Sequence, residues 1–183
     1  MKILIASDIH GSEVYCRQLL ERYKEEKCDR MLFLGDILYH GPRNGLTDFY
    51  DPKKVIDMLN EYKDSITSVR GNCDAEVDQV VLQFPIMADY TILYHGKHMI
   101  YATHGHIYGE QNPPPTLRRG DVLLCGHTHV PACNEYDDFT YINPGSVTLP
   151  KGGSERSYIV FEDGKFTFKT LEGKTYKEFG LAE

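Results

Sequence analysis

Five short apolar segments of this chain each run directly into a polar segment in which Asp, Asn or His stands near a glycine. The junctions are residues 3–6 before Ser7-Asp8-Ile9-His10-Gly11, 31–34 before Gly35-Asp36, 66–69 before Arg70-Gly71-Asn72-Cys73-Asp74, 99–102 before Thr103-His104-Gly105-His106, and 122–125 before Gly126-His127-Thr128-His129. Short apolar runs bounded by turn residues are typical of buried strands. Because ligands gather beyond the carboxyl ends of strands in α/β sheets, we expect one functional patch at a shared edge.

The side chains in these junctions are of the types that bind divalent metals. Imidazole, carboxylate and amide oxygen together suit Mn, Fe, Co, Ni or Zn. In Asp8-Ile9-His10 and His127-Thr128-His129, alternate side chains point to the same side if the backbone stays extended, and Gly35 and Gly126 leave room for close backbone approach. Asp36 is a candidate bridge between two ions about 3.5–4 Å apart, which would share a hydroxide and bind a phosphoryl oxygen.

Each of these residues also has a simpler interpretation. Asp8 or Asp36 alone is typical of a strand-end turn or helix cap, a lone His104 or His127 of a hydrogen-bonded core histidine, and Asn72 after a glycine of a turn. Their joint occurrence after five separate strands favours the metal site.

The first half of the chain predicts alternating strands and helices. Strands are expected at residues 2–6, 30–34 and 65–69, with a helix at 12–27 that Ser12 would cap and a second that begins at Asp51-Pro52. The segment 37–50 reads as a loop. This β-α-β-α-β order is typical of a parallel layer packed with helices.

The second half predicts mainly hairpins. They are expected at residues 90–94 with 98–101, 132–136 with 139–142, and 158–162 with 165–171, the last around Asp163-Gly164, and a further strand at 121–125. We predict an α+β fold: a parallel-leaning sheet first, an antiparallel or mixed sheet second, and helices outside. The 183 residues fit one domain, 1–183, with no composition break.

Composition excludes several classes of function. A formal net charge of −7 argues against a stable complex with nucleic acid or an anionic membrane. The five cysteines, an odd number without CxxC spacing, favour reduced thiols and a cytoplasmic location over a disulfide framework. No apolar run approaches the roughly 20 residues that a membrane span needs, and residues 1–6 reach Ser7-Asp8 too early for a signal peptide.

In their order and spacing, the five junction motifs resemble the calcineurin-like metallophosphoesterases, over residues 2 to about 160. The stretch 35–44, the Cys73 position and Asn143-Pro144-Gly145-Ser146 are similar to the small bacterial YfcE-type phosphodiesterases in particular. The resemblance implies a four-layer α/β/β/α sandwich with two mixed sheets. It also implies in-line attack on phosphorus by a hydroxide that bridges two metal ions.

The resemblance further implies which residues hold the ions. Asp8, His10 and His129 would hold one divalent ion, Asn72, His104 and His127 the other, and Asp36 would bridge them. Mn²⁺ is the expected metal, with Ni²⁺, Co²⁺, Fe²⁺ or Zn²⁺ as alternatives. A small phosphodiester is the expected partner, and a homo-oligomer is possible.

One residue departs from the family pattern. Many members have His where this chain has Cys73, and that His is thought to protonate the leaving oxygen or stabilise the transition state. The resemblance therefore implies a phosphodiesterase with weak monoesterase activity. Asn72, Cys73 and His106 are the candidate catalytic residues. The alternative for Cys73 is a packed thiol with no chemical role. His106 or His40 is a candidate to supply the proton in its place, and the alternative for each is a supporting or loop residue.

Other interpretations stay open at this point. The same site would serve a phosphomonoesterase or a protein phosphatase. A metallophosphoesterase-like fold also serves as a non-catalytic retromer subunit, although such scaffolds tend to lose metal ligands. The acidic charge and the lack of an appended DNA-binding region weigh against a nuclease. Arg43 and Asn44 are candidates for phosphate contact, or simply for an exposed loop.

Overall fold

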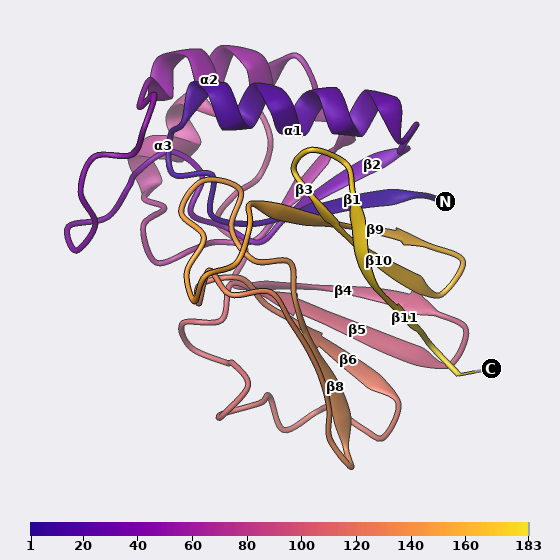
Figure 1. Ribbon diagram of the computed structural model, residues 1–183. Helices are drawn as coiled ribbons and strands as arrows, with labels where there is room; N and C mark the ends of the chain where they lie inside the picture. The colour runs from indigo at the N-terminus through magenta and orange to yellow at the C-terminus, as the bar shows by residue number, and fades with distance from the viewer. Residues whose placement is uncertain (183) are drawn as a thin grey trace.

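The computed structural model describes residues 1–182 and contains two mixed β-sheets that face each other (Figure 1). The first sheet has the spatial order β11 (Thr175–Gly180), β10 (Lys165–Thr170), β9 (Ser157–Glu162), β1 (Ile3–Ala6), β2 (Arg30–Phe33) and β3 (Ile66–Ser68). Its strands β1, β2 and β3 are parallel, whereas β9 pairs antiparallel with β1 and is followed outward by β10 and β11.

The second sheet has the order β4 (Tyr90–His95), β5 (His98–Thr103), β6 (Asp121–Leu124), β8 (Phe139–Asn143) and β7 (Ala132–Glu135). Strands β5, β6 and β8 are parallel, and β4 and β7 pair antiparallel at the two edges. Each sheet therefore has three parallel strands whose carboxyl ends lie at one edge.

The helices cover the outer face of the first sheet. Figure 1 shows α1 (Glu13–Glu25) and α2 (Pro52–Asn60) side by side over β1, β2 and β3. The short helices η1 (Lys63–Ser65) and α3 (Glu76–Val81) precede and follow β3. Leu19 of α1 and Leu59 of α2 pack with Met31 and Phe33 of β2, all fully buried or nearly so. This apolar contact holds the helical layer on the sheet.

A second core fills the space between the two sheets. Ile5 and Leu32 of the first sheet pack with Val122 and Leu124 of the second, and all are buried. The outer face of the second sheet carries residues 104–120, which form turns and coil, and Leu117 from this segment packs on a third cluster that includes Tyr101. The two mixed sheets and the flanking helices match the predicted fold class, with the helices concentrated on the first sheet.

The predicted start of α2 is confirmed, but that of α1 needs a correction. Asp51 accepts a hydrogen bond from the Lys54 backbone N–H, and Pro52 is the first helical residue. Ser12 also precedes its helix, but its hydroxyl donates to the Asp48 carbonyl instead of capping α1. A long-range contact to the loop thus replaces the local cap.

Two features of the sheets were not predicted. The strands expected at residues 158–162 and 165–171 were assigned to the second sheet by their order in the chain, whereas β9 and β10, which match them, extend the first sheet beyond β1. Strand β11 and helix α3 were missed altogether, because neither buries a regular apolar face: every β11 residue is exposed or half-buried, and α3 has no buried residue. Across residues 1–182, none of the helices combines the length and apolar character that crossing a bilayer requires.

The inter-sheet core gives the first testable prediction. Leu124 ends β6 just before the polar segment 126–129 and is 0% exposed. Leu124→Ala should lower the free energy of unfolding by about 2–5 kcal/mol in urea titrations, because a buried cavity replaces the side chain. Leu46→Ala is the matched control, since Leu46 is 69% exposed; an equal effect of both would contradict this packing.

Candidate metal centre

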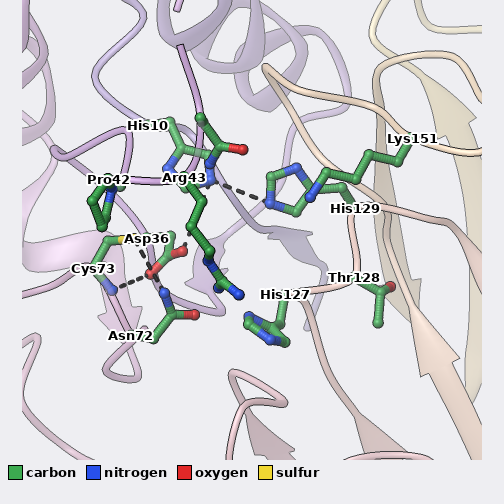
Figure 2. A pocket seen from close by; sticks show the side chains of 12 residues that line it. His10, Asp36, Pro42, Arg43, Asn72, Cys73, His127, Thr128, His129 and Lys151 are labelled. Atoms are coloured by element: carbon green, nitrogen blue, oxygen red, sulfur yellow. Dashed lines mark hydrogen bonds and ion pairs between the residues drawn. The ribbon is translucent and has the colours of Figure 1, made fainter. Parts of the chain in front are cut away.

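All five junction segments meet at the edge where the parallel strands of both sheets end. Four of them, all but the segment that follows β5, line a cavity of about 430 Å³ (Figure 2). The described residues that line it are His10, Asp36, Gly41, Pro42, Arg43, Asn44, Asn72, Cys73, His127, Thr128, His129 and Lys151. Two of these, Asp36 and Asn72, follow strands of the first sheet, and His127 and His129 follow β6 of the second. The site therefore exists only while the two sheets are packed together.

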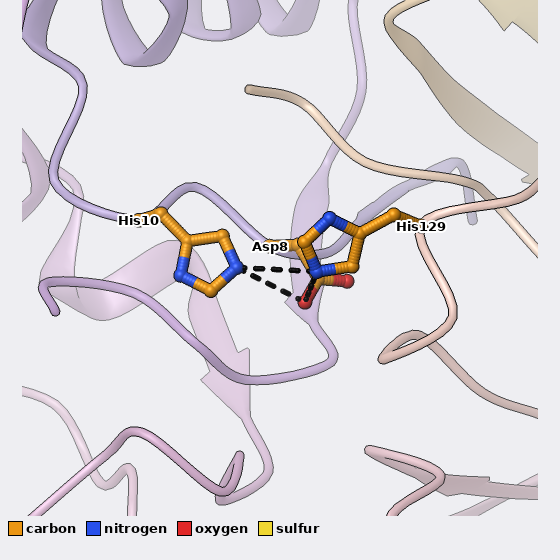
Figure 3. A group of neighbouring side chains, drawn as sticks. All are labelled: Asp8, His10 and His129. Carbon is orange, nitrogen blue, oxygen red and sulfur yellow. Dashed lines mark hydrogen bonds and ion pairs between the residues drawn. The ribbon is translucent and has the colours of Figure 1, made fainter. Parts of the chain in front are cut away.

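One group of candidate metal-binding donor atoms comes from the loops that follow β1 and β6. The Nε2 atoms of His10 and His129 are 3.3 Å apart, and each lies close to Asp8 Oδ1, at 3.5 and 3.2 Å respectively (Figure 3). All three residues are buried. The three atoms form one of the groups whose spacing fits a single metal ion.

A second group lies beside it. His104 Nε2 is 3.1 Å from Asn72 Oδ1, 3.2 Å from His127 Nδ1 and 3.5 Å from Asp36 Oδ2. The same Asp36 oxygen is 3.8 Å from His10 Nε2 in the first group. Asp36 therefore stands between the two groups and faces both.

The tautomers of the histidines show that lone pairs face one another here. The Nδ1–H groups of His10, His104 and His129 donate to the backbone carbonyls of residues 39, 34 and 149, at 2.7, 2.6 and 2.7 Å. In the neutral rings each Nε2 then carries a lone pair aimed into the site. Asp8 Oδ1 likewise is buried and accepts no hydrogen bond. Lone pairs at such short distances repel unless a cation lies among them.

The spacing is that of ligands around a shared ion. Nitrogen and oxygen ligands about 2.1 Å from a divalent ion lie about 3.0–3.4 Å from each other. The donor distances within each group, from 3.1 to 3.5 Å, match this closely. The residues present therefore fit divalent metal in both groups.

The electrostatics of the cluster point the same way. Burial alone would raise the pKa of Asp8, but the adjacent His10 and His129 side chains, together with the charge of His104, outweigh it and hold that pKa well below its usual value. Burial would lower the pKa of His104, yet the carboxylates of Asp36 and Asp8 raise it to about 9. The two buried carboxylates thus attract positive charge into the site, which a proton or a metal cation can supply.

Five of the seven candidate ligands have left-handed backbone conformations. The φ angles of Asp8, His10, Asp36, His127 and His129 are +60°, +48°, +56°, +65° and +61°. The extended backbone that would place alternate side chains of residues 8–10 and 127–129 on one side is therefore not found here. Such conformations cost about 1–3 kcal/mol each outside glycine and concentrate at functional sites. Here they turn side chains from sharply bent loops toward one point.

Glycines allow the loops to touch. A Cβ on Gly71 would lie 2.1 Å from Asp36 Oδ1, and one on Gly126 would lie 1.8 Å from the Ser7 hydroxyl oxygen. Close approach at Gly126 was predicted, and the structure confirms it. Without these glycines, the β1 and β6 loops, and the β2 and β3 loops, could not pack directly against each other.

Asp74 braces the loops after β2 and β3. Its carboxylate accepts hydrogen bonds from the backbone N–H groups of Asp36, Ile37 and Gly71, at 2.8, 2.9 and 2.7 Å. It is not among the residues that line the cavity, so it supports the loops and does not face the metal centre. Burial raises the pKa of Asp74 although these three bonds favour its charged form.

A further brace comes from the last residue of β8 and the segment that follows it, which is not among the five junctions. Asn143 donates to the Gly126 carbonyl at 2.7 Å, Ser146 to the Asp8 carbonyl at 3.0 Å, and Thr148 to the Ile9 carbonyl at 2.6 Å. Ser146 thus has a structural role, since its hydroxyl fixes the loop that carries Asp8. The signal that could have revealed the brace is the sixth apolar strand, which also ends in Asn, Pro and Gly.

The three candidate catalytic residues lie in different surroundings. Asn72 belongs to the second donor group. Cys73 borders the cavity, and its backbone N–H donates to Asp36 Oδ1 at 2.8 Å; burial, followed by the nearby Asp36 carboxylate, raises the pKa of its thiol to about 12. His106 is an exposed rim residue whose ring centre is 5.4 Å from that of His104. His40 is packed against Tyr39 and Tyr50 and does not line the described cavity.

Two cationic side chains face the cavity from opposite loops. Figure 2 shows Arg43 reaching over Asp36 and Asn72, while Lys151 lies beside His129. Both are exposed. Arg43 and Asn44 were expected as candidates for phosphate contact. Lys151 was missed, because nothing in its local sequence connects it with residues more than a hundred positions earlier.

Comparison with known proteins gives a consistent result. Residues 1–164 match the calcineurin-like phosphoesterase superfamily domain. The chain is 45% identical over 163 residues to Phosphodiesterase YfcE of Escherichia coli strain K12, which covers 89% of this chain and 88% of that protein. It superposes on the structure of Yfce, a phosphoesterase from E. coli, with a TM-score of 0.95, 39% identity and full coverage of both chains.

A more distant likeness concerns the fold alone. Vacuolar Protein Sorting 29 from Cryptosporidium parvum superposes with a TM-score of 0.62 at 18% identity, over 98% of this chain and 97% of that one. The same two-sheet architecture is thus shared with a protein whose name indicates a role in sorting.

The brace at Asp74 gives the second testable prediction. Asp74→Ala would leave three buried N–H groups without an acceptor, so the free energy of unfolding should fall by about 2–4 kcal/mol and Mn²⁺ affinity by about 10–100-fold. Urea titration and calorimetric metal titration measure the two effects. Asp57→Ala, at an exposed position of α2, is the control. Metal binding by Asp74→Ala at wild-type strength would show that the brace does not position the ligands.

Proposed function

The chain belongs to the calcineurin-like phosphoesterase superfamily, and from this premise we propose that it is a metal-dependent phosphodiesterase acting on a small diester. The observation that carries the proposal is the pair of lone-pair clusters that share Asp36. The high identity to a protein named as a phosphodiesterase supports the choice of substrate class.

We assign the candidate ligands as two sets joined by Asp36. Asp8, His10 and His129 would hold one divalent ion, and Asn72, His104 and His127 would hold the other. When bound, two such ions activate water as a nucleophile and neutralise charge on the phosphoryl oxygens. Mn²⁺ suits the mixed oxygen and nitrogen set, as do Ni²⁺, Co²⁺, Fe²⁺ and Zn²⁺.

The chain's own residues would bind and orient the substrate. Arg43 and Lys151 bring positive charge to the mouth of a cavity in a protein with a net charge of −7. Their side chains would attract the phosphate and hold its outer oxygens, Arg43 with its planar pair of N–H donors. Asn72 and His127 also line the cavity and would limit how the phosphate turns.

Position 73 favours diesters over monoesters for an electrostatic reason. A monoester dianion carries one more negative charge than a diester, so an additional cation beside the phosphate favours the monoester. A histidine at this position could supply that cation, whereas the Cys73 thiol, with a pKa of about 12, stays neutral. This is why we place phosphomonoesters second.

The remaining features of the proposal concern the setting of the enzyme. Cys16, Cys28, Cys73, Cys125 and Cys133 are all free thiols in the structure, which supports a cytoplasmic location. We also propose that residues 1–183 act as one domain, supported by the pairing of β9 with β1 across the length of the chain. A homo-oligomer stays a prediction. The complete donor set favours an enzyme over a non-catalytic scaffold.

Metal removal tests the proposed function. Exhaustive chelation should abolish hydrolysis of bis(p-nitrophenyl) phosphate, and Mn²⁺ should restore it at about two ions per chain. Asp36→Asn should lower kcat/KM by more than about a hundredfold, with folding checked by circular dichroism. Asparagine keeps an oxygen for the Cys73 N–H, so the variant isolates the lost charge. Full activity in the chelated protein or in Asp36→Asn would refute the two-metal site.

Exchange at position 73 tests the substrate preference. Cys73→His should raise monoesterase relative to diesterase kcat/KM by about tenfold or more, since proton donation or a local cation is typically worth about 10²–10⁴ in rate. The readout is the ratio for p-nitrophenyl phosphate and bis(p-nitrophenyl) phosphate. Cys73→Ser is the matched control, because serine stays neutral. The same ratio in wild type and Cys73→His would show that this position does not set the preference.

A further inference from the structure

A second cavity, of about 420 Å³, adjoins the metal centre. Its side chains are mostly apolar or aromatic and come from the loop after β2, from α2, from the loop after β3 and from α3. The main ones are Tyr39, Tyr50, Ile56, Cys73, Val77 and Val81. Cys73 lines this cavity and the metal cavity alike. We call the second cavity the Cys73 groove.

The Cys73 groove contains exposed apolar side chains that are not part of the hydrophobic core. Val77, Val81 and Tyr39 are 68%, 41% and 40% exposed, and α3, which supplies the two valines, buries no side chain. Apolar groups gathered at one place on a surface are characteristic of a site that binds a ligand. Helix α3 thus contributes to the groove instead of to the core.

The walls of the groove are tied directly to the candidate metal ligands. The backbone carbonyl of Tyr39 accepts the Nδ1–H of His10 at 2.7 Å. The backbone N–H of Cys73 donates to Asp36 Oδ1 at 2.8 Å. A group in the groove therefore lies at a defined place beside a phosphate at the metal centre.

The charges of the groove restrict what it can hold. Among the described residues that line it, Asp78 is the one charged side chain, and its carboxylate accepts the Ala75 N–H at 2.9 Å. No Lys or Arg lies among those residues to bind a further phosphate or carboxylate. An uncharged, apolar group is the complement of this lining.

We propose that the Cys73 groove binds an aromatic or similarly apolar arm of the phosphodiester, while its phosphate lies at the metal centre. This rests on the proposed phosphodiesterase function, because only a diester has a second arm. A cavity of about 150 Å³ is enough for a benzene ring, so the groove has room for an aryl or bicyclic arm. The small, polarisable sulfur of Cys73 stands at the junction and suits contact with an aromatic ring.

Binding of two diesters with poor leaving groups tests the groove. Methyl phenyl phosphate has one aryl arm and dimethyl phosphate has none. The Mn²⁺-loaded protein should bind methyl phenyl phosphate about tenfold more tightly than dimethyl phosphate in calorimetric titrations. A difference in affinity of about tenfold is at the lower end of what an apolar pocket gives for an added apolar group. Val77→Gln and Val81→Gln should each remove most of this preference and leave the Kd of dimethyl phosphate unchanged.

Val80→Gln is the matched control. Val80 lies on the same helix and is 83% exposed, but it does not line the groove. Its variant should keep the wild-type preference for the aryl diester. An equal affinity of the wild type for both diesters, or an equal loss in Val80→Gln, would overturn the proposal. A lower mass of Val77→Gln than of the wild type in light scattering would also overturn it, because the face would then be a contact between copies.

Hydrolysis is measured separately, so the two proposals can fail independently. If bis(p-nitrophenyl) phosphate is hydrolysed but the aryl preference is absent, the groove is wrong and the phosphodiesterase function stands. If the preference is present and sensitive to Val77 and Val81 but no diester is hydrolysed, the groove is supported and the function is wrong.

Discussion

The convergence of unprotonated donor atoms at one buried point is the constraint on which this structure depends. Asp8 Oδ1 and the Nε2 atoms of His10 and His129 lie within 3.5 Å of one another with no hydrogen between them in the neutral rings. Without a cation the lone pairs of these atoms repel one another, so interactions elsewhere in the fold must hold the three side chains in place. The carbonyls that fix each Nδ1–H do part of this. Buried carboxylates then make the site favourable for cations, as the raised pKa of His104 indicates.

Packing between the sheets and hydrogen bonds between the loops also hold these side chains in place. The candidate ligands come from both sheets, so the two sheets must keep a fixed position relative to each other. The buried side chains between the sheets fix that position. Left-handed residues such as Asp36 and His127 cost free energy locally. The hydrogen bonds that Asp74 accepts from the neighbouring loops, and the one that Asn143 donates to the β6 loop, offset that cost. Stability and metal affinity are therefore coupled through the same contacts.

Most of the side chains that converge at this point were candidates from the sequence, because the signals for them are local. An apolar strand followed by Asp, Asn or His is visible within about ten residues, and so is the cap at Asp51-Pro52. Features that depend on distant residues were not predictable: the reach of Lys151 to the cavity and the pairing of β9 with β1. The left-handed loops were missed because Asp and His carry no strong preference for that conformation. Strand β11 was missed because it pairs through its backbone without a buried face.

Position 73 joins the two kinds of chemistry in this molecule. On one side it borders charged groups that would act on the phosphate, and on the other an apolar groove. A cationic side chain there would add charge beside the phosphate. A larger side chain would narrow the space where the two cavities meet. Charge and size at this one residue thus act in the same direction, since both favour a substrate with one negative charge and an apolar second arm. The proposed preference for diesters would then follow from both effects, not from the loss of a proton donor alone.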